Sequence, residues 1–529
     1  MQPLRLGTRR SLLARAQSSA VARQLERLHP GLEVELVGIE TRGDRITDIP
    51  LSQVDGKEFF TAEIDAALRD GAVDFTVHSY KDLSLERPAE LFLGAVPVRE
   101  NPRDIIFFSA DVLAALHRGE QLRIGSSSPR RQAFVPSFLE RALPWSTSAG
   151  AARVQLCELR GNVDTRLRRL LEARGSERHL DGVILAFAGL SRLWQDEAVG
   201  AAAVLRELLS GLPRMLLPLT LCPAAPAQGA LAIECRANDA HTRQILAAMD
   251  DLPTRTAIDM ERALLAERGG GCHQRFGATA VQVLGLGSVL YLREAGPQGA
   301  AAPQLRWTAP VRTAAQARLP VRAWDGSAPE SAALGAIEPI AGAAEECARR
   351  LSLTRAAFVA HRRALPDLTA VQVSGCRHIW VSGTDSWFAL AARGVWVEGC
   401  AEGLGFAALR TVLAAPLLCL PPLAQWLALT HSEAAAGWGE IPVLATYRHR
   451  AGEPGTGNAG AEAATAAIAA ASHLWWHSSA QFERWHSYAR GDTQHGCGPG
   501  KTADLLRHAG VENLTVFPSV RHWQEWLRA

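Results

Sequence analysis

Basic side chains are concentrated at the ends of predicted strands and the starts of predicted helices. Lys81 and Asp82 follow residues 73–78, an apolar run typical of a buried strand. Six arginines occupy comparable places: Arg9, Arg130, Arg131, Arg160, Arg166 and Arg192. Because guanidinium groups bind carboxylates through paired hydrogen bonds, this placement predicts a cleft for a ligand with several carboxylates. A solvated basic face is enough to explain the neighbouring Arg168, Arg169 and Arg174.

Three serines, residues 126–128, precede Pro129 and two of these arginines at the predicted start of a helix. Hydroxyl groups and unpaired backbone N–H groups at a helix N-terminus form an anion site, which adjacent arginines strengthen. We therefore expect Ser127, Ser128, Arg130 and Arg131 to bind an anionic group of the ligand.

A glycine run, residues 269–271, carries Cys272 on a loop. Glycine adopts positive φ angles readily, so the backbone there can approach a ligand closely. A cysteine in such a loop can anchor a ligand, act as a nucleophile or be a small buried side chain. Considered alone, the buried thiol is the favoured interpretation, because free cysteine usually behaves as a small hydrophobe.

The elements that must position these residues follow a strand–helix–strand order. The predicted strands are 4–8, 32–40, 73–78, 122–125, 156–159 and 182–187, and the first two helices are 11–28 and 60–68. This order implies parallel sheets, whose ligands bind beyond the carboxyl ends of the strands. Residues 228–234 are predicted to return to the first sheet. Residues 46–60 are expected to form either a mobile loop over the crevice or an ordinary surface loop.

The rest of the chain predicts further units. A helix at 253–268 leads to the Cys272 loop. Two antiparallel strands, 278–292 and 304–312, around a Gly/Pro/Ala turn, with a helix near 341–352, would complete a small α+β domain. Beyond it alanine, tryptophan and histidine become more frequent. At about 150 residues per domain, the 529 residues predict three or four domains.

Composition excludes several classes of partner. A net charge of +2 gives no signal for nucleic acid or a membrane surface, and no apolar run reaches the length of a membrane span. The nine cysteines are scattered without zinc-site spacing, so we expect no metal. Their odd number and the lack of a leader pattern predict a cytoplasmic protein. Only three basic residues are lysines, Lys57, Lys81 and Lys501.

Ten motifs give the first 350 residues a resemblance to the porphobilinogen deaminase (hydroxymethylbilane synthase) family. In the family's order these are TRRSLLA, TRGD, DGKEFF, VHSYKD, ENPRD, IGSSSPRRQ, LRGNVDTRL, LAFAGLSRL, QGALAIE and GGGC. The resemblance implies an α/β fold with two doubly wound, periplasmic-binding-protein-like domains and a small α+β domain that carries the cysteine. The implied boundaries are 1–98 with 228–250, 99–227, and 251–355.

The resemblance also implies a chemistry. Porphobilinogen units, each losing ammonia, are added to a dipyrromethane cofactor bound through a thioether to Cys272, and the product is hydroxymethylbilane. Asp82 would stabilise the cation left by ammonia and accept pyrrole N–H bonds, although an ordinary helix cap is its alternative role. The family's cofactor-binding positions match Cys272, Lys81, Ser79, Ser127, Ser128, Arg130, Arg131 and Asp82. Its substrate-binding positions match Arg9, Ser11, Lys57, Phe60, Arg160, Asn162, Arg166, Arg192 and Gln228.

Residues 356–529 resemble the latter half of the uroporphyrinogen-III synthase family, through SGTDSWFALAARGVW, WWHSSAQF and GCGPGKTADLLRHAG. Such a fusion would join consecutive steps, because that family cyclises hydroxymethylbilane. Tyr447 matches a tyrosine near that family's cleft, and a core tyrosine is an equal alternative. The range is short for two complete α/β lobes, so an active synthase and a degenerate interaction or stability domain both remain open.

The competing function from another class is a non-enzymatic, two-lobed anion-binding protein. It predicts no covalent group on Cys272 and no need for Lys81 and Asp82. We otherwise expect a monomer that acts on porphobilinogen and binds neither nucleic acid nor membrane.

Overall fold

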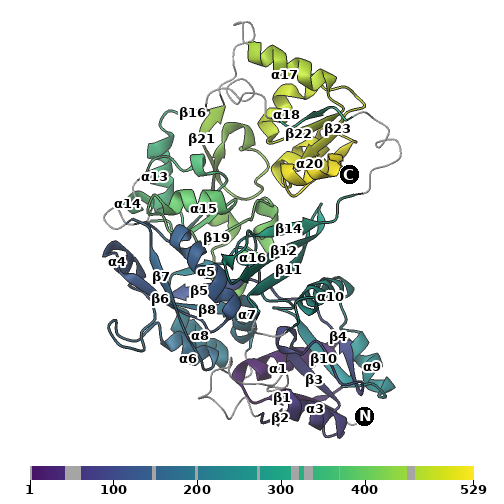
Figure 1. Cartoon of the computed structure of the whole chain (residues 1–529). Coiled ribbons are helices and arrows are strands. Elements are labelled where there is room, and N and C mark those ends of the chain that lie inside the picture. Colours follow the sequence, from purple (N-terminus) through teal and green to yellow (C-terminus); the bar gives the residue numbers. More distant parts are fainter. Residues whose placement is uncertain are drawn as a thin grey trace.

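The computed structural model describes most of the chain. The described residues are 3–41, 61–145, 150–196, 200–270, 274–310, 321–326, 337–368, 370–373, 375–449 and 459–528, without the side chains of 370–371 and 459–461. They form five sheets and the helices around them (Figure 1).

The first sheet has five strands in the order β2-β1-β3-β10-β4. Their bounds are Leu4–Arg9 (β1), Val34–Ile39 (β2), Phe75–Ser79 (β3), Leu91–Ala95 (β4) and Leu231–Arg236 (β10), with helices α1 (Leu12–Leu28), α3 (Ala62–Arg69) and α9 (Ala240–Ala247). Strands β1, β2 and β3 are parallel, and β10 is antiparallel to both of its neighbours. The predicted return of residues 228–234 to this sheet is therefore confirmed.

The second sheet repeats this pattern in the order β7-β6-β8-β5-β9. Its elements are β5 (Asp104–Phe108), β6 (Gln121–Gly125), β7 (Arg153–Cys157), β8 (Gly182–Ala186), β9 (Arg214–Leu216), α4 (Val112–His117), α5 (Pro129–Ala142), α6 (Val163–Arg168), α7 (Phe187–Gln195) and α8 (Ala201–Leu209). Again three strands are parallel and one, β5, is antiparallel to both neighbours. Two crossover segments, 96–103 and 217–230, connect the two sheets.

The third unit has helix α10 (Leu252–Ala266) packed on an antiparallel sheet. Its strands are β11 (Phe276–Val283), β12 (Gly287–Gly296), β13 (Gly299–Ala300) and β14 (Gln304–Trp307). The prediction of one strand over 278–292 is wrong: these residues belong to two paired strands, because Gly285, at φ +81°, lies in a tight turn within the apolar run. The second strand, predicted over 304–312, ends at Trp307.

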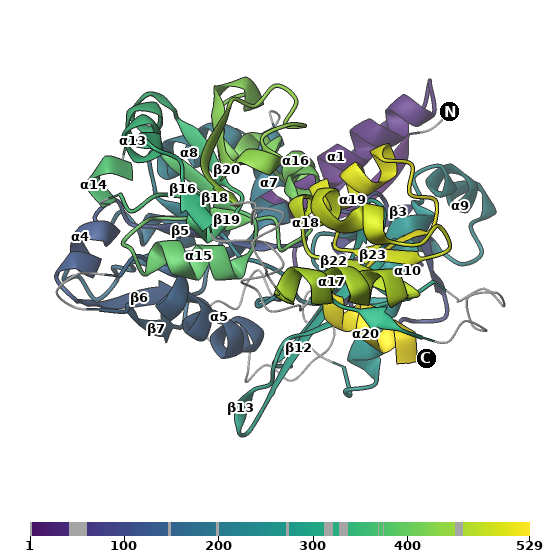
Figure 2. The same ribbon diagram turned by 90° about the horizontal axis from the view of Figure 1, so that it is seen from above.

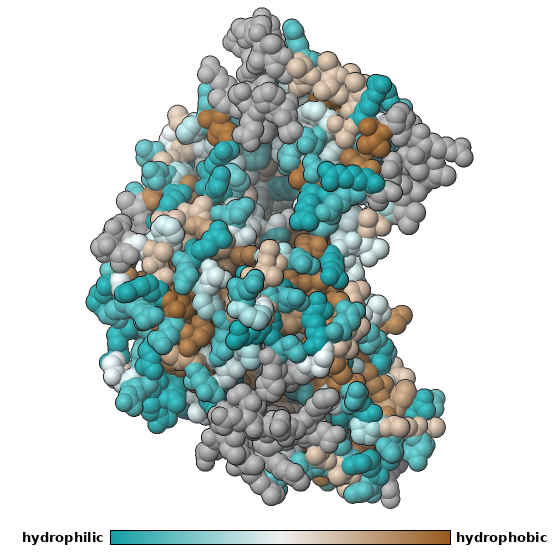
Figure 3. Space-filling view, in the orientation of Figure 1, coloured by the Kyte–Doolittle hydropathy of each residue, from teal (hydrophilic) through white to brown (hydrophobic). Residues whose placement is uncertain are grey.

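The C-terminal part forms two further sheets. The six-stranded sheet runs β16-β21-β20-β17-β18-β19, and the four-stranded sheet runs β15-β22-β23-β24. The strands are β15 (Ala323–Trp324), β16 (Ile337–Pro339), β17 (Ala356–Val359), β18 (His378–Val381), β19 (Gly399–Cys400), β20 (Trp426–His431), β21 (Val443–His449), β22 (His473–Trp476), β23 (Gln494–Cys497) and β24 (Leu514–Val516). The helices are α13 (Ala343–Leu353), α14 (Ala370–Val373), α15 (Thr384–Ala391), α16 (Arg410–Leu413), α17 (Ala459–Ala470), α18 (Ser479–Trp485), α19 (Lys501–His508) and α20 (Val520–Arg528). We call the six-stranded sheet with its helices the first C-terminal lobe and the four-stranded sheet with its helices the second. Figure 3 shows the surface hollowed between these two lobes, in the upper part of the view.

The boundary expected at residue 355 does not coincide with the start of these sheets. Strand β15 pairs with β22 and β16 pairs with β21, although both precede residue 355. Such short strands lack a recognisable period, and only long-range pairing identifies them. They supply strands that the range 356–529 lacks, so each of the two C-terminal sheets is larger than that range alone predicts.

The six-stranded sheet packs directly against the second sheet. Trp387 of α15 meets Phe138 of α5 edge to face, with ring centroids 5.2 Å apart, and donates a hydrogen bond to the carbonyl of Ala142. The backbone N–H of Leu216 in β9 donates to the carbonyl of Glu398, just before β19. One continuous apolar core joins the two sheets, and Figure 2 shows α13, α14 and α15 on the same side of the molecule as α4 and α5.

Among the described residues, no single helix is long and apolar enough to cross a membrane. One pair, Phe406–Leu413 with Pro416–Gln425, meets that criterion only when its two helices, bent by 87°, are taken together.

Candidate active site

The predicted binding residues gather at the carboxyl ends of the parallel strands, as sheet topology requires. In the first sheet, Arg9 ends β1 and Ser79 ends β3, and a short 3-10 helix, η2 (Tyr80–Asp82), carries Lys81 and Asp82. In the second sheet, Ser127, Ser128, Arg130 and Arg131 follow β6, Arg160 and Asn162 follow β7, and Arg192 lies in α7 after β8. Both sheets therefore contribute residues to the candidate site.

A fully buried carboxylate, Asp104, holds the two adjacent arginines of α5. Arg130 Nη2 donates to Asp104 Oδ2 at 2.8 Å, and Arg131 Nη2 donates to Asp104 Oδ1 at 2.7 Å. Burial opposes the ionisation of Asp104, but the two positive charges outweigh it and hold its pKa well below the usual range. The Nε atoms of both arginines are buried and have no hydrogen-bond partner in the described part of the chain. Asp104 thus fixes both arginines in place, and their Nε–H groups remain as hydrogen-bond donors for a ligand.

The predicted residue Gln228 connects this pair to the first sheet. Its amide nitrogen donates to Asp104 Oδ1 at 2.8 Å and to the carbonyl of Pro102 at 2.7 Å. Its amide oxygen accepts a hydrogen bond of 3.4 Å from Lys81 Nζ. Burial lowers the pKa of Lys81, although the neighbouring Asp82 carboxylate favours its charged form. Lys81 and the arginine pair therefore lie in one network that spans both sheets.

Positive charge exceeds negative charge around this network. Burial, together with the charges of Arg131 and Arg160, lowers the pKa of Arg166 to about 10, and among the described residues only Asp82 acts in the opposite direction. Burial also lowers the pKa of Arg192 to about 10, and Arg192 donates to the carbonyl of Gly229 at 2.7 Å. Such crowding of guanidinium groups fits a ligand that brings several carboxylates.

Asp82 itself is exposed, and no described side chain forms an ion pair with it. Its carboxylate lies close enough to Lys81 and Arg166 to affect the pKa of both. It does not cap a regular helix, since η2 ends at Asp82. The ordinary N-cap role considered from the sequence is therefore not seen.

The predicted serines make local hydrogen bonds. Ser127 Oγ donates to the carbonyl of Leu159 at 2.7 Å, and Ser79 is hydrogen-bonded to Gln17 at 3.1 Å. Ser128 caps α5 and Ser11 caps α1, each accepting from a backbone N–H. Asn162 precedes α6 without a side-chain cap bond and is exposed. These contacts position the loops, and the side chains predicted to bind an anion at the start of α5 are already hydrogen-bonded within the protein.

Three predicted residues, Cys272, Lys57 and Phe60, lie outside the described residues. One residue that the sequence did not single out, Asp104, is central to the site. The available signal was the motif ENPRD, in which an acid opens a wholly apolar strand; an acid at such a position requires a buried cation.

Tyr447 lies at the carboxyl end of β21, in a cluster of aromatic and ionisable groups. Its buried ring has its centroid 5.6 Å from that of His431 and 5.8 Å from that of His449. Glu433 lies 2.8 Å from Nδ1 of His431 and 3.4 Å from Nδ1 of His449. Burial opposes ionisation of Glu433, but hydrogen bonds from its own backbone amide and from His431 outweigh it and lower its pKa to about 2.

This cluster lies beside the second C-terminal lobe. Lys501, at the start of α19, donates to the carbonyls of Ala434 and Ala436 at 2.8 and 2.6 Å and lies over the ring of Trp438. Tyr447 also belongs to the apolar core that joins the sheets. It is therefore a core tyrosine, one of the two roles considered from the sequence, and it also lies beside this ionisable cluster. The set His431, Glu433 and His449, and a buried set of Asp65, His78 and Glu234, each bring three possible metal ligands within 4.8 Å of one another.

Comparison with known proteins assigns the first half of the chain. A family model described as "Porphobilinogen deaminase, dipyromethane cofactor binding domain" matches residues 4–244. The porphobilinogen deaminase of Syntrophotalea carbinolica is 40% identical over 277 residues, which cover 52% of this chain and 78% of that protein. The porphobilinogen deaminase of Nitratidesulfovibrio vulgaris is 41% identical over 283 residues, which cover 53% of this chain and 78% of that protein.

Solved structures give weaker matches. The periplasmic aliphatic sulphonate binding protein SsuA from Escherichia coli aligns with 17% identity and a TM-score of 0.24, covering 51% of this chain and 76% of that one.

Proposed function

The chain belongs to the porphobilinogen deaminase family, and we propose that its hydroxymethylbilane synthase activity resides in the cleft lined by Lys81, Asp82 and the Asp104–arginine network. The observation that carries this proposal is the hydrogen-bonded path from Lys81 through Gln228 to Asp104, Arg130 and Arg131. It brings residues of both sheets to one place, with more positive than negative charge among the described residues. A non-enzymatic anion-binding protein would not need Asp82 beside these cations.

The described residues fit the family's cofactor, dipyrromethane. Its two pyrrole rings carry acetate and propionate side chains, and the buried Nε atoms of Arg130 and Arg131 provide donors that no described residue uses. We propose that these arginines, with Lys81, Ser127 and Ser128, hold the cofactor carboxylates, and that Cys272 anchors it by a thioether. When bound, dipyrromethane supplies the fixed primer to which substrate units are added.

We assign the remaining binding positions to the substrate and the growing product. Each added porphobilinogen breaks its aminomethyl C–N bond and releases ammonia. The freed methylene forms a carbon–carbon bond to the terminal pyrrole of the growing chain, whose α-carbon loses its proton, so that one ammonia is released for each unit added. Asp82, whose side chain is exposed, can accept a hydrogen bond from the pyrrole N–H group and offset the positive charge that develops when ammonia leaves. Arg166 and Arg192 can take substrate carboxylates, together with Arg9, Ser11, Lys57, Phe60, Arg160 and Asn162.

The shared strand order of the first two sheets supports two periplasmic-binding-protein-like domains, 1–98 with 228–250 and 99–227. The cleft then lies between them, as in other two-lobed folds whose ligands bind beyond the strand ends.

Intact mass tests the cofactor assignment. The purified chain should be heavier than its sequence mass by one dipyrromethane and should react with Ehrlich's aldehyde reagent. Cys272→Ser should have the sequence mass, whereas Cys419→Ser, which removes an exposed thiol elsewhere, should keep the adduct. An unmodified parent chain, prepared without cofactor starvation, would contradict the proposal.

A second candidate function belongs to the C-terminal part, cyclisation of hydroxymethylbilane to uroporphyrinogen III. It is favoured by Tyr447, His431 and Glu433 at the carboxyl edge of a parallel sheet, beside Lys501 of the neighbouring lobe. The full chain should convert porphobilinogen into isomer III, and Tyr447→Phe should reduce that isomer while leaving porphobilinogen consumption unchanged. Isomer I alone from the unmodified chain would favour the alternative, a degenerate domain that stabilises the deaminase.

A further inference from the structure

The two crossover segments, 96–103 and 217–230, are the covalent connections between the first two sheets. Because Lys81 and Asp82 lie on one side and the arginines on the other, these segments determine how the two halves of the deaminase site are aligned. A contact that fixes both segments therefore acts on the geometry of the site without touching the substrate.

One carboxylate of the C-terminal region contacts both segments. Glu402, in the turn after β19, accepts hydrogen bonds from Nε and Nη2 of Arg103 at 2.9 and 2.6 Å through Oε1. Its other oxygen, Oε2, accepts from the backbone N–H of Thr220 at 3.2 Å. Arg103 lies on the first crossover segment and Thr220 on the second. Glu402 thus connects them across an interface between distant parts of the chain.

The local structure around Glu402 is specialised for this contact. Its backbone has φ +56°, a region that residues other than glycine rarely adopt, and the surrounding structure must enforce it. Only 1% of its side chain is exposed. Burial opposes the charge of Arg103, but Glu402 outweighs this effect and raises the pKa of Arg103. The Glu402–Arg103 contact is therefore a buried ion pair and not a surface one.

Arg103 transmits this contact to the site through the next residue. Asp104 follows it directly, and the side chains of consecutive residues point in opposite directions in extended chain. Glu402 therefore holds the backbone from one side, through Arg103. Asp104 binds Arg130 and Arg131 on the opposite side of the same backbone. The backbone carbonyl of Asp104 also accepts from Leu217 N–H, so the two segments run side by side at this point.

We infer that Glu402 is a positioning residue for the deaminase reaction, through which the C-terminal region aligns the two halves of the active site. The C-terminal region would then be required for full deaminase turnover whether or not it catalyses cyclisation.

The test uses the full chain with its cofactor bound and compares Glu402→Gln with Glu398→Gln. Glu398 is a matched control because it is a buried carboxylate of the same interface that pairs with Arg214 and His378 and contacts neither crossover segment through its side chain. We expect E402Q to lower the deaminase kcat by roughly tenfold or more with a smaller change in KM, because each half of the site still binds but alignment is lost. E398Q should keep the parent kcat.

A double variant separates positioning from general loosening. If Glu402 acts through Arg103, R103M/E402Q should be no slower than R103M alone, since interacting residues are not additive. An unchanged kcat in E402Q, equal losses in E402Q and E398Q, or multiplying losses in the double variant would each overturn the inference. Thermal unfolding and intact mass confirm that each variant is folded and loaded. Should E402Q not fold, Arg103→Lys, which keeps the charge but loses the paired donors, takes its place in the same comparison.

Discussion

Replacing Asp104 by asparagine tests the electrostatic core of the deaminase site. The substitution keeps the shape of the side chain and removes its charge. Arg130 and Arg131 then remain buried, with one carbonyl oxygen and one amide group in place of two anionic acceptors. The amide N–H group would face a guanidinium donor, so one of the two hydrogen bonds is lost as well.

The expected cost follows from the burial of the pair. Asp104 is fully buried and the two arginines nearly so, and leaving buried charges unpaired costs about 3–5 kcal/mol of stability. For a cooperative unit of about 150–250 residues, this corresponds to a fall in melting temperature of roughly 6–20 °C. Deaminase turnover should fall as well, because the arginines lose their fixed positions.

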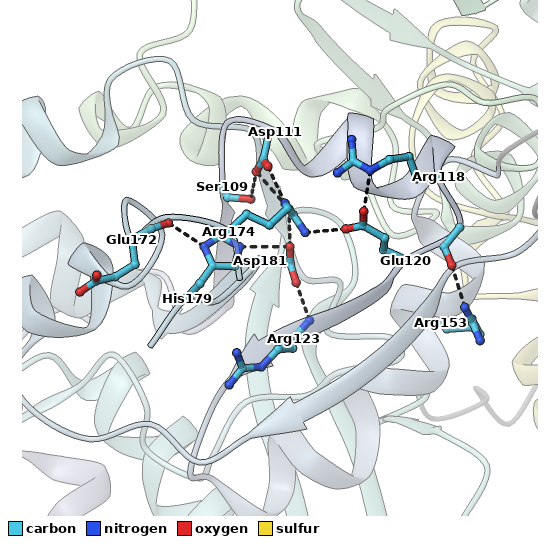
Figure 4. A network of polar contacts seen from close by, with 11 residues as sticks. Ser109, Asp111, Arg118, Glu120, Arg123, Arg153, Glu172, Arg174, His179 and Asp181 are labelled. Atoms are coloured by element: carbon cyan, nitrogen blue, oxygen red, sulfur yellow. Dashed lines mark hydrogen bonds and ion pairs between the residues drawn. The ribbon is translucent and has the colours of Figure 1, made fainter. Parts of the chain in front are cut away.

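Asp111→Asn in the same sheet is the matched control. Asp111 also binds one arginine through both oxygens, Arg174 at 2.6 and 3.1 Å, but its side chain is 45% exposed (Figure 4). Solvent-exposed pairs contribute about 0–1 kcal/mol, so its melting temperature should change little. Thermal unfolding followed by circular dichroism measures both variants. Equal melting temperatures for D104N and D111N would refute the claim that burial makes the Asp104 pair dominant.

The pH dependence has a defined sign. The folded-state pKa of Asp104 is depressed, so its contribution is fully present above the unfolded-state pKa of about 3.9 and is lost as pH falls below it. The difference between the parent chain and D104N should therefore be constant from about pH 7 to pH 5 and shrink only in stronger acid.

Three further outcomes follow from individual side chains. Asp82→Ala should fold with a melting temperature close to that of the parent, since its side chain is exposed, but lose about 100-fold or more in turnover; normal turnover would show that another carboxylate is used. Arg166→Leu should raise the KM for porphobilinogen without lowering the melting temperature, because burial and neighbouring arginines disfavour its charge; a lower melting temperature with unchanged KM would contradict a binding role. Burial lowers the pKa of Lys501 to about 8, so an amine-acylating reagent should modify it with a midpoint near that pH, read by peptide mass; a midpoint near 10.5 would show that it is not desolvated.

Local patterns predicted seven of the ten strands of the first two sheets and missed β4, β5 and β9. The buried strands β3 and β8 are short apolar runs, and their polar continuations, Ser79 to Asp82 and the α7 segment with Arg192, lie at carboxyl ends as predicted. Strand–helix–strand order constrains topology strongly, because parallel strands require crossovers of this kind. The accumulation of arginines at these ends was likewise visible without coordinates.

The sequence did not predict which distant strands pair with one another. The short strands β15 and β16 have no periodicity of their own, and only their pairing with β22 and β21 reveals that the C-terminal sheets begin before residue 355. The boundary expected at residue 355 therefore does not separate the C-terminal sheets from the preceding unit.

The sequence by itself determined the residue types of the deaminase cleft and the strand ends that carry them. Tertiary structure decided how those residues are held: Asp104 fixes Arg130 and Arg131, Gln228 connects Lys81 to them, and Glu402 reaches Arg103 from 299 positions further along the chain. The physical reason is that a buried charge needs a partner but does not specify where in the sequence that partner lies. Spacing can predict an element, whereas only packing selects which distant carboxylate meets which guanidinium.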